Sequence, residues 1–167
     1  MNTDRSVQPR FLTNARTTTA AQRILVAEDD EETRDVVVTA FLEEGHDVYG
    51  LDGEAGLTEC LGIIARHRLR APDLIAVGVR MAWHSGVDLV EEIRSAGWDT
   101  PVVLMTWAAP RNARYVVERA GAAALVCKPF LVSELRSAAR RARQQRRGPE
   151  LARAVPATHP MARWSLP

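Results

Sequence analysis

The sequence contains no long hydrophobic run. Among its 167 residues, no apolar stretch approaches the roughly 18 residues that a membrane-spanning helix requires. The opening segment, residues 1–22, also lacks the apolar centre of a signal peptide. We therefore expect a cytoplasmic protein that does not enter a membrane.

Cysteine is scarce, since the chain holds only Cys60 and Cys127. A chain of this length suits one domain and can bury roughly 70% of the surface that its unfolded form exposes, so no disulfide is needed. Cys60 falls on an apolar helical stripe and Cys127 ends an apolar strand. We predict that both are small, buried apolar side chains.

Lysine is scarcer still, because 21 of the 22 basic residues are arginine and only Lys128 is lysine. A lysine ammonium is a compact point charge that a forked guanidinium does not replace, so Lys128 is the first candidate for function. Charge is also segregated. Residues 28–44 hold eight acids and one base, Arg34, whereas residues 136–147 hold six arginines and no acid.

The sequence also has no internal repeat and no glycine-rich phosphate loop. Instead, five strand-like apolar runs alternate with helix-like periods over residues 22–147. The strands are apolar throughout, which predicts an α/β domain with a doubly wound five-stranded parallel sheet and helices on both faces. A flexible tail, residues 1–21, precedes this domain, and a proline-containing tail, residues 148–167, follows it. The last predicted helix buries Leu131, Leu135, Ala138 and Ala142.

Polar residues gather where the predicted strands end. In sheets of this kind, ligands bind at the carboxyl ends of the strands, so these positions are the candidate site. Glycine weakens a strand interior, so the one that ends the third strand stands out. The strand-end residues are Glu28, Asp29 and Asp30 after the first strand, Gly78 in the third, Thr106 in the fourth, and Lys128 with Pro129 after the fifth.

This order resembles the receiver domain of bacterial response regulators, which has a flavodoxin-like fold. The resemblance covers residues 22–145 and is carried by ILVAEDD, PDLI with SG after it, a strand that ends in Thr106, and KPF. It implies a phosphoryl switch in a two-component or phosphorelay system. By this resemblance Glu28 and Asp29 hold Mg²⁺, and an aspartate at a strand end accepts the phosphoryl group. Thr106 and Lys128 then bind its oxygens.

The resemblance also implies a cis peptide bond before Pro129.

The chain departs from the family at the acceptor itself. The acceptor stands five positions after the aspartate of the PD pair, here Asp73, and that position is Gly78. Asp73 is predicted to lie at the other end of the strand, roughly 16 Å away, and so cannot substitute. Three further departures are Trp107, expected to cover the pocket, Leu125 in place of an aromatic residue, and Leu131 in place of a helix-capping residue.

The leading hypothesis is a stand-alone pseudo-receiver, not an enzyme, that acts as a phosphorylation-independent protein-interaction module. In it Lys128 and Arg80 neutralise Glu28 and Asp29, although Arg80 is equally consistent with a solvated loop side chain. No cofactor is expected beyond a weakened Mg²⁺ site at Glu28 and Asp29. One alternative keeps phosphotransfer with a displaced acceptor, Asp29 or Asp30.

The expected partner is a signalling protein with an acidic docking surface, because arginines crowd the predicted interaction face. A second alternative is nucleic-acid binding by the arginine-rich last helix, which we do not favour because few aromatic residues accompany it. The sequence does not indicate an oligomeric state. The predicted interaction face consists of Arg111, Arg114, Arg119, Leu125, Arg136, Arg140 and Arg143.

Overall fold

The computed structural model describes residues 20–79, 83–108, 111, 113, 117 and 121–145, with the backbone alone at 83–85, 87 and 145. The strands are β1 (Arg23–Glu28), β2 (Asp47–Asp52), β3 (Leu74–Val79), β4 (Val102–Thr106) and β5 (Ala124–Cys127). The helices are α1 (Glu31–Leu42), α2 (Gly53–Arg66), α3 (Trp83–Ser95) and α5 (Val132–Gln145). The helix predicted around residues 113–120 lies largely outside the described residues. None of the described helices has the length and apolar character to cross a membrane.

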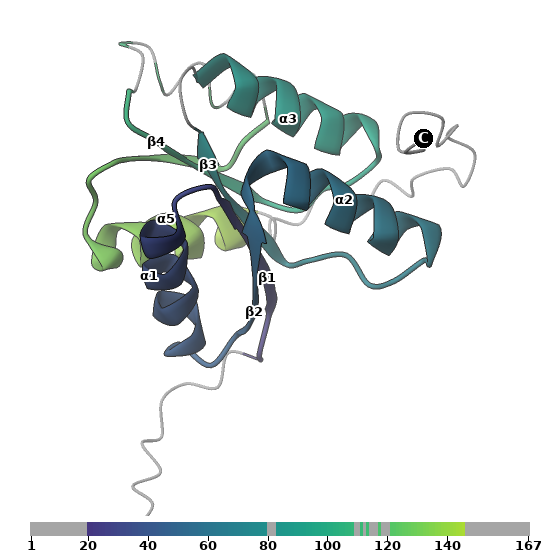
Figure 1. The fold of residues 1–167 in the computed structure, drawn as a ribbon, viewed down its shortest axis with the longest axis horizontal. Coiled ribbons are helices and arrows are strands. Elements are labelled where there is room, and N and C mark those ends of the chain that lie inside the picture. Colours follow the sequence, from purple (N-terminus) through teal and green to yellow (C-terminus); the bar gives the residue numbers. More distant parts are fainter. Residues whose placement is uncertain are drawn as a thin grey trace, which may run out of the picture.

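The five strands form one parallel sheet in the order β2-β1-β3-β4-β5. The chain moves outward from β1 to β2, crosses back to β3 and then continues to β5, so the strand order reverses beside β1. Helices α1 and α5 cover one face of the sheet, and α2 and α3 cover the other (Figure 1). The predicted doubly wound five-stranded fold is confirmed.

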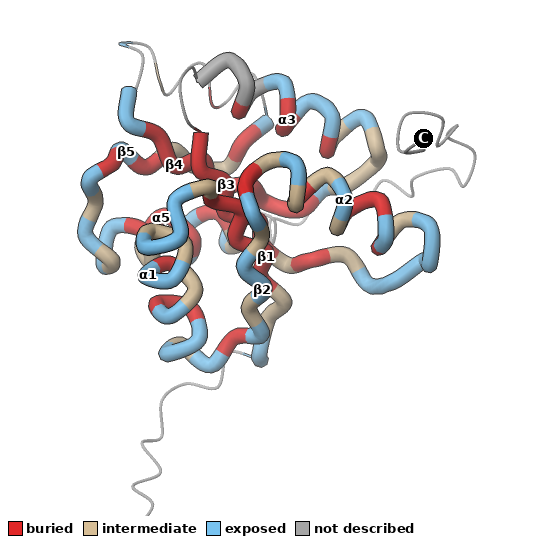
Figure 2. The backbone as a smooth tube through the Cα atoms, in the orientation of Figure 1, coloured by how far each residue is buried: buried red, intermediate tan, exposed pale blue. Residues whose placement is uncertain are grey.

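Each face of the sheet has its own apolar core. Along β1, Leu25 and Ala27 face α2 and α3, whereas Ile24 and Val26 face α1 and α5. This alternation is the period of two that a strand imposes on its side chains. The three central strands, β1, β3 and β4, are buried on both faces, as the central band of buried residues in Figure 2 shows, which explains why their sequences are mostly apolar. The prediction that all five strands are apolar throughout is wrong for the edge strand β2, whose sequence DVYGLD is largely exposed.

The helix ends are fixed by local hydrogen bonds. The side chain of Asp30 caps α1 by accepting from the Thr33 N–H at 2.8 Å. At α5, the N–H of Leu131 donates to the Glu134 carboxylate at 3.0 Å, which is half of a capping box. The prediction that Leu131 is buried is wrong: it is 68% exposed because it precedes α5 and lies off the apolar stripe that begins at Leu135.

The prediction of two buried cysteines is also wrong. Cys60 is half-buried and packs against the core beneath α2, while Cys127 is exposed. The reason is the position of β5, which is one of the two edge strands of the sheet and ends at Cys127. A residue there has a neighbouring strand on one side only, so an apolar strand sequence does not ensure burial.

Candidate functional site

The predicted site residues meet at the carboxyl edge of the sheet. Glu28 is the last residue of β1, Thr106 is the last of β4, and Gly78 is the penultimate residue of β3. Thr106 pairs with Cys127 of β5, and the backbone N–H of the next residue, Lys128, donates to the Thr106 carbonyl at 2.7 Å. The parallel strands therefore bring together residues that are up to 100 positions apart in the chain.

Glu28 and Lys128 form a buried ion pair at this edge. The Lys128 Nζ donates to the Glu28 Oε2 at 2.5 Å, and the two side chains are only 5% and 4% exposed. The second carboxylate oxygen accepts from the backbone N–H of Asp30 at 3.3 Å. Each buried charge thus has an oppositely charged partner inside the protein. The Lys128–Pro129 peptide bond is cis, as expected.

The carboxylate of Glu28 occupies the space that a side chain at position 78 would take. A Cβ atom built on Gly78 overlaps the Glu28 Oε2, and it lies 2.6 Å from the Glu28 carboxyl carbon. Real Cβ atoms essentially never approach other heavy atoms so closely. Gly78 is therefore neither a bulge nor a turn here. The Glu28 carboxylate occupies the space that the missing side chain of Gly78 leaves.

The other two strand-end acids are directed elsewhere. A Cβ atom on Gly53, at the start of α2, would overlap the Asp29 carboxylate, so Asp29 lies against the backbone of that helix. Gly53 has a φ of +61°, a conformation that glycine adopts readily. The carboxylate of Asp30 is the cap of α1, and its hydrogen bonds with Thr33 lower the pKa of Asp30 below its usual 3.8.

Thr106 and Trp107 complete this edge. Thr106 is buried, and its hydroxyl lies 3.3 Å from the N–H and 3.4 Å from the carbonyl of Ala108, so it bonds to its own loop. The Lys128 Nζ lies 5.7 Å from the centre of the Trp107 ring, within cation–π range. The expectation that Trp107 covers the pocket is met only in part, because the side chain reaches Lys128 but the residue is 63% exposed.

The arrangement does not fit a magnesium ion. Mg²⁺ needs several oxygen ligands in near-octahedral geometry. Here one Glu28 oxygen is bound to Lys128, the other accepts from a backbone N–H, and Asp29 is turned toward Gly53. Among the described residues, no three His, Cys, Asp or Glu side chains are grouped so that they could hold a metal.

Three predicted interface arginines contact the end of α1 or the turn that follows it. Arg136 and Arg140 form ion pairs with Glu43 and Glu44, just after α1, and Arg143 contacts His46. The sequence showed that arginines are concentrated in residues 136–147, but it could not show that the acidic residues after α1 lie opposite them.

The remaining predicted interface residues are placed less completely. Arg111 is exposed, and Leu125 is half-buried against the core beneath α3. Arg80, Arg114 and Arg119 lie outside the described residues. Whether any of these residues meets a partner stays a prediction.

Sequence reasoning missed the part played by Arg34. Its guanidinium donates to the Glu28 carbonyl at 2.7 Å and lies 3.6 Å from the Asp52 carboxylate, while its stem packs beside Gly50. Arg34 thereby joins the ends of β1 and β2. The available signal was its position as the one base among eight acids in residues 28–44.

Asp73 has a structural role at the other end of β3. Its carboxylate accepts from the Arg23 N–H at 3.0 Å and from the Arg70 guanidinium at 2.9 Å. This position, just before β3 begins, separates Asp73 from Gly78 by most of the strand, as expected.

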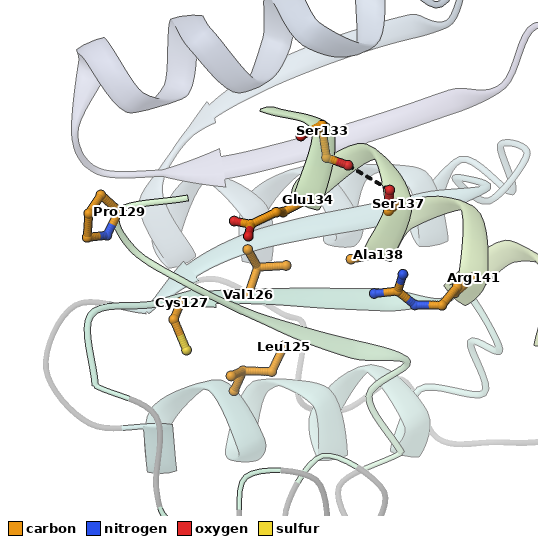
Figure 3. A pocket seen from close by; sticks show the side chains of 9 residues that line it. All are labelled: Leu125, Val126, Cys127, Pro129, Ser133, Glu134, Ser137, Ala138 and Arg141. Carbon is orange, nitrogen blue, oxygen red and sulfur yellow. Dashed lines mark hydrogen bonds between the residues drawn. The ribbon is translucent and has the colours of Figure 1, made fainter. Parts of the chain in front are cut away.

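A groove of about 590 Å³ lies between β5 and α5 (Figure 3). Arg141 and Glu134 extend into it from the helix, and Ser137 donates to the Ser133 carbonyl at 2.7 Å. The buried ion pair is not part of its lining. The groove is lined by Leu125, Val126, Cys127, Pro129, Ser133, Glu134, Ser137, Ala138 and Arg141.

Comparison with known proteins agrees with this geometry. The response regulator receiver domain family matches residues 24–140. The chain therefore belongs to this family, the receiver domains of two-component response regulators. Receiver domains are signalling modules that interact with other signalling proteins.

Individual relatives are similar over most of this chain. Regulatory protein AtoC of Escherichia coli is 32% identical over 128 residues, which is 75% of this chain and 26% of AtoC. Transcriptional regulatory protein PdtaR of Mycobacterium tuberculosis is 32% identical over 114 residues, 68% of this chain and 53% of PdtaR. The chain thus spans about a quarter and about half of these two relatives.

Solved structures share the fold. NtrX from Brucella abortus, in complex with ADP, is 28% identical with a TM-score of 0.61, over 75% of this chain and 27% of that one. The chemotaxis protein CheY4 of Vibrio cholerae is 21% identical with a TM-score of 0.60, over 74% of this chain and 99% of that one.

Proposed function

We propose that this protein is a pseudo-receiver, a receiver domain that works as a protein-interaction module without aspartyl phosphorylation. The observation that carries the proposal is the Glu28 carboxylate, which fills the room left by Gly78 and pairs with Lys128 at 2.5 Å. At the position where the family resemblance places the acceptor there is no nucleophile. The lysine expected to bind phosphoryl oxygens is already neutralised.

The same contacts argue against a displaced acceptor. Asp30 is used as the cap of α1, and Asp29 lies against Gly53. Because Mg²⁺ does not fit the site, a phosphoryl group would also lack the cation that offsets its charge. The site therefore lacks a nucleophile, a fit for Mg²⁺ and an unpaired lysine ammonium. Together these features support a site that stays in one state and does not switch by phosphorylation.

A phosphodonor experiment tests the proposal. The wild-type protein and Gly78→Asp are incubated with Mg²⁺ and acetyl phosphate, and intact mass is measured. The wild type is expected to gain no phosphoryl group. In Gly78→Asp the new side chain must displace Glu28. It places a carboxylate at the acceptor position, so a fraction of this variant is expected to gain a phosphoryl group.

Beryllofluoride, a phosphoryl mimic, gives a second readout through tryptophan emission, because Trp107 lies close to Lys128. Gly78→Ala is the matched control, since its Cβ displaces Glu28 without supplying a carboxylate, and it should respond in neither assay. Trp107→Phe shows how much of the signal comes from that ring. A phosphoryl group on the wild-type protein would overturn the proposal and favour Asp29 or Asp30 as acceptor.

The partner we propose remains a signalling protein with an acidic docking surface. The arginines on α5 are in part engaged with Glu43 and Glu44 of the same chain, which leaves less basic surface than the sequence suggests. For the same reason, nothing in the contacts of α5 favours nucleic acid over protein.

A further inference from the structure

Helix α5 is attached to the domain by few large apolar side chains. In the described part of the chain, its buried side chains are Leu135, Ala138, Ala139 and Ala142. Alanine buries little area, so polar contacts account for an unusual share of the attachment. Arg136 provides the first of them: its guanidinium donates twice to the Ala40 carbonyl, at 2.6 and 3.1 Å, and pairs with Glu43 at 2.7 Å.

The C-terminal half of α5 is held by a second group, which includes a histidine. Arg140 pairs with Glu44 at 3.1 Å, and a guanidinium nitrogen of Arg143 lies 3.1 Å from the Nε2 of His46. Both acceptors belong to the short turn between α1 and β2. This turn therefore holds the C-terminal half of α5 against the domain.

His46 is almost completely buried, with 4% of its side chain exposed. Arginine only donates hydrogen bonds, so the Nε2 accepts from Arg143 and the neutral ring carries its proton on Nδ1. The Nδ1 has no hydrogen-bond partner among the described residues. A further proton therefore has one place to bind, the Nε2 that faces Arg143.

We propose that His46 is the proton-operated latch of α5: protonation at Nε2 releases Arg143 and frees the C-terminal half of the helix. The proton comes from solvent and converts Nε2 from acceptor to donor, so the hydrogen bond from Arg143 breaks and two cations face each other. The Glu44 carboxylate lies 3.7 Å from the Nε2 and can accept from the new N–H.

The charges around His46 decide when the latch opens. Arg143 faces it from α5, Glu44 from the turn, Asp47 from β2, and Asp73 from the segment before β3. Burial, followed by Arg143, lowers the pKa of His46 below its usual 6.5, and the three carboxylates oppose this shift. The latch is closed at neutral pH and opens on acidification, when Arg143 no longer binds His46.

Amide hydrogen exchange of the full chain tests the latch. Local opening that takes up one proton becomes up to about tenfold more favourable per pH unit below the ordinary histidine pKa. After correction for intrinsic rates, amides near the end of α5 are expected to lose protection by that factor as the pH falls below 6.5. Amides near Arg136, which His46 does not contact, are the internal reference and should stay protected.

His46→Gln is the matched variant, because a glutamine oxygen can accept from Arg143 but does not titrate. It should remove the acid-induced loss of protection. The same loss in this variant, uniform loss along α5, or no loss in the wild type would each overturn the proposal. If His46→Gln does not fold, Arg143→Met serves: its helix end should already exchange faster at pH 7.5, with a weaker pH dependence. A wild-type profile in Arg143→Met would equally refute the latch.

Discussion

At the scale of single residues, the site is governed by a side chain that is missing. Gly78 leaves room, Glu28 enters it, and Lys128 thereby gains a permanent partner. The sequence showed the absent acceptor and suggested that Lys128 pairs with an acid. It could not show which acid, because the choice between Glu28 and Asp29 depends on side-chain rotamers and on the close approach of Gly53 to Asp29.

The buried pair leads to a stability prediction. Lys128→Met leaves the Glu28 carboxylate buried without an oppositely charged partner, and we expect a loss of about 3–5 kcal/mol in the free energy of unfolding. Glu28→Gln should also destabilise the protein. The double variant should recover much of the loss, since neither charge is then buried. Urea denaturation of all four proteins measures the coupling, and strictly additive losses would show that the two groups do not interact.

At the scale of secondary-structure elements, hydrophobic periodicity predicted the strands and most helices because both faces of the sheet are covered. The contacts between elements were not predictable in the same way. No sequence pattern indicates that Arg136 of α5 binds the carbonyl of Ala40, because the two residues are 96 positions apart. Exposure at the edge strand β5 was missed because strand order is not encoded in any one strand.

The close packing of α3 on the sheet leads to a second prediction. A Cβ atom on Gly86 would lie 2.7 Å from the Val79 Cγ2, and Val79 is a stiff, buried, β-branched residue. Gly86→Ala should therefore cost about 1–3 kcal/mol, despite the better helix propensity of alanine.

Gly56→Ala in α2 is the matched control for this variant. Its Cβ would make ordinary contact, with its nearest neighbour 3.5 Å away at Leu51, so this variant should be neutral or more stable by up to about 1 kcal/mol. Thermal unfolding compares the two variants. Equal effects would mean that α3 does not depend on the close approach at Gly86.

At the scale of the whole molecule, stability is linked to pH through His46. The pKa of His46 is lowered in the folded protein, chiefly by burial, so the unfolded chain takes up a proton first as the pH falls below about 6.5. The free energy of unfolding should then decrease by up to about 1.4 kcal/mol per pH unit until the folded pKa is reached. Above pH 6.5 this residue should make no difference.

Urea midpoints measured between pH 5 and 8 test this linkage, with His46→Gln as the control that lacks the slope. The linkage belongs to global unfolding and holds whether or not α5 opens first. An equal slope in both proteins would assign it to other groups.

The buried pair of Glu28 and Lys128 also bears on how information is stored. An acyl phosphate is hydrolysed with time, so the phosphorylated state of a receiver has a limited lifetime. An ion pair between two side chains of the same fold has no such lifetime. A signal carried by this ion pair in the proposed way does not decay on the molecule, and at constant pH its strength is set by the number of copies present.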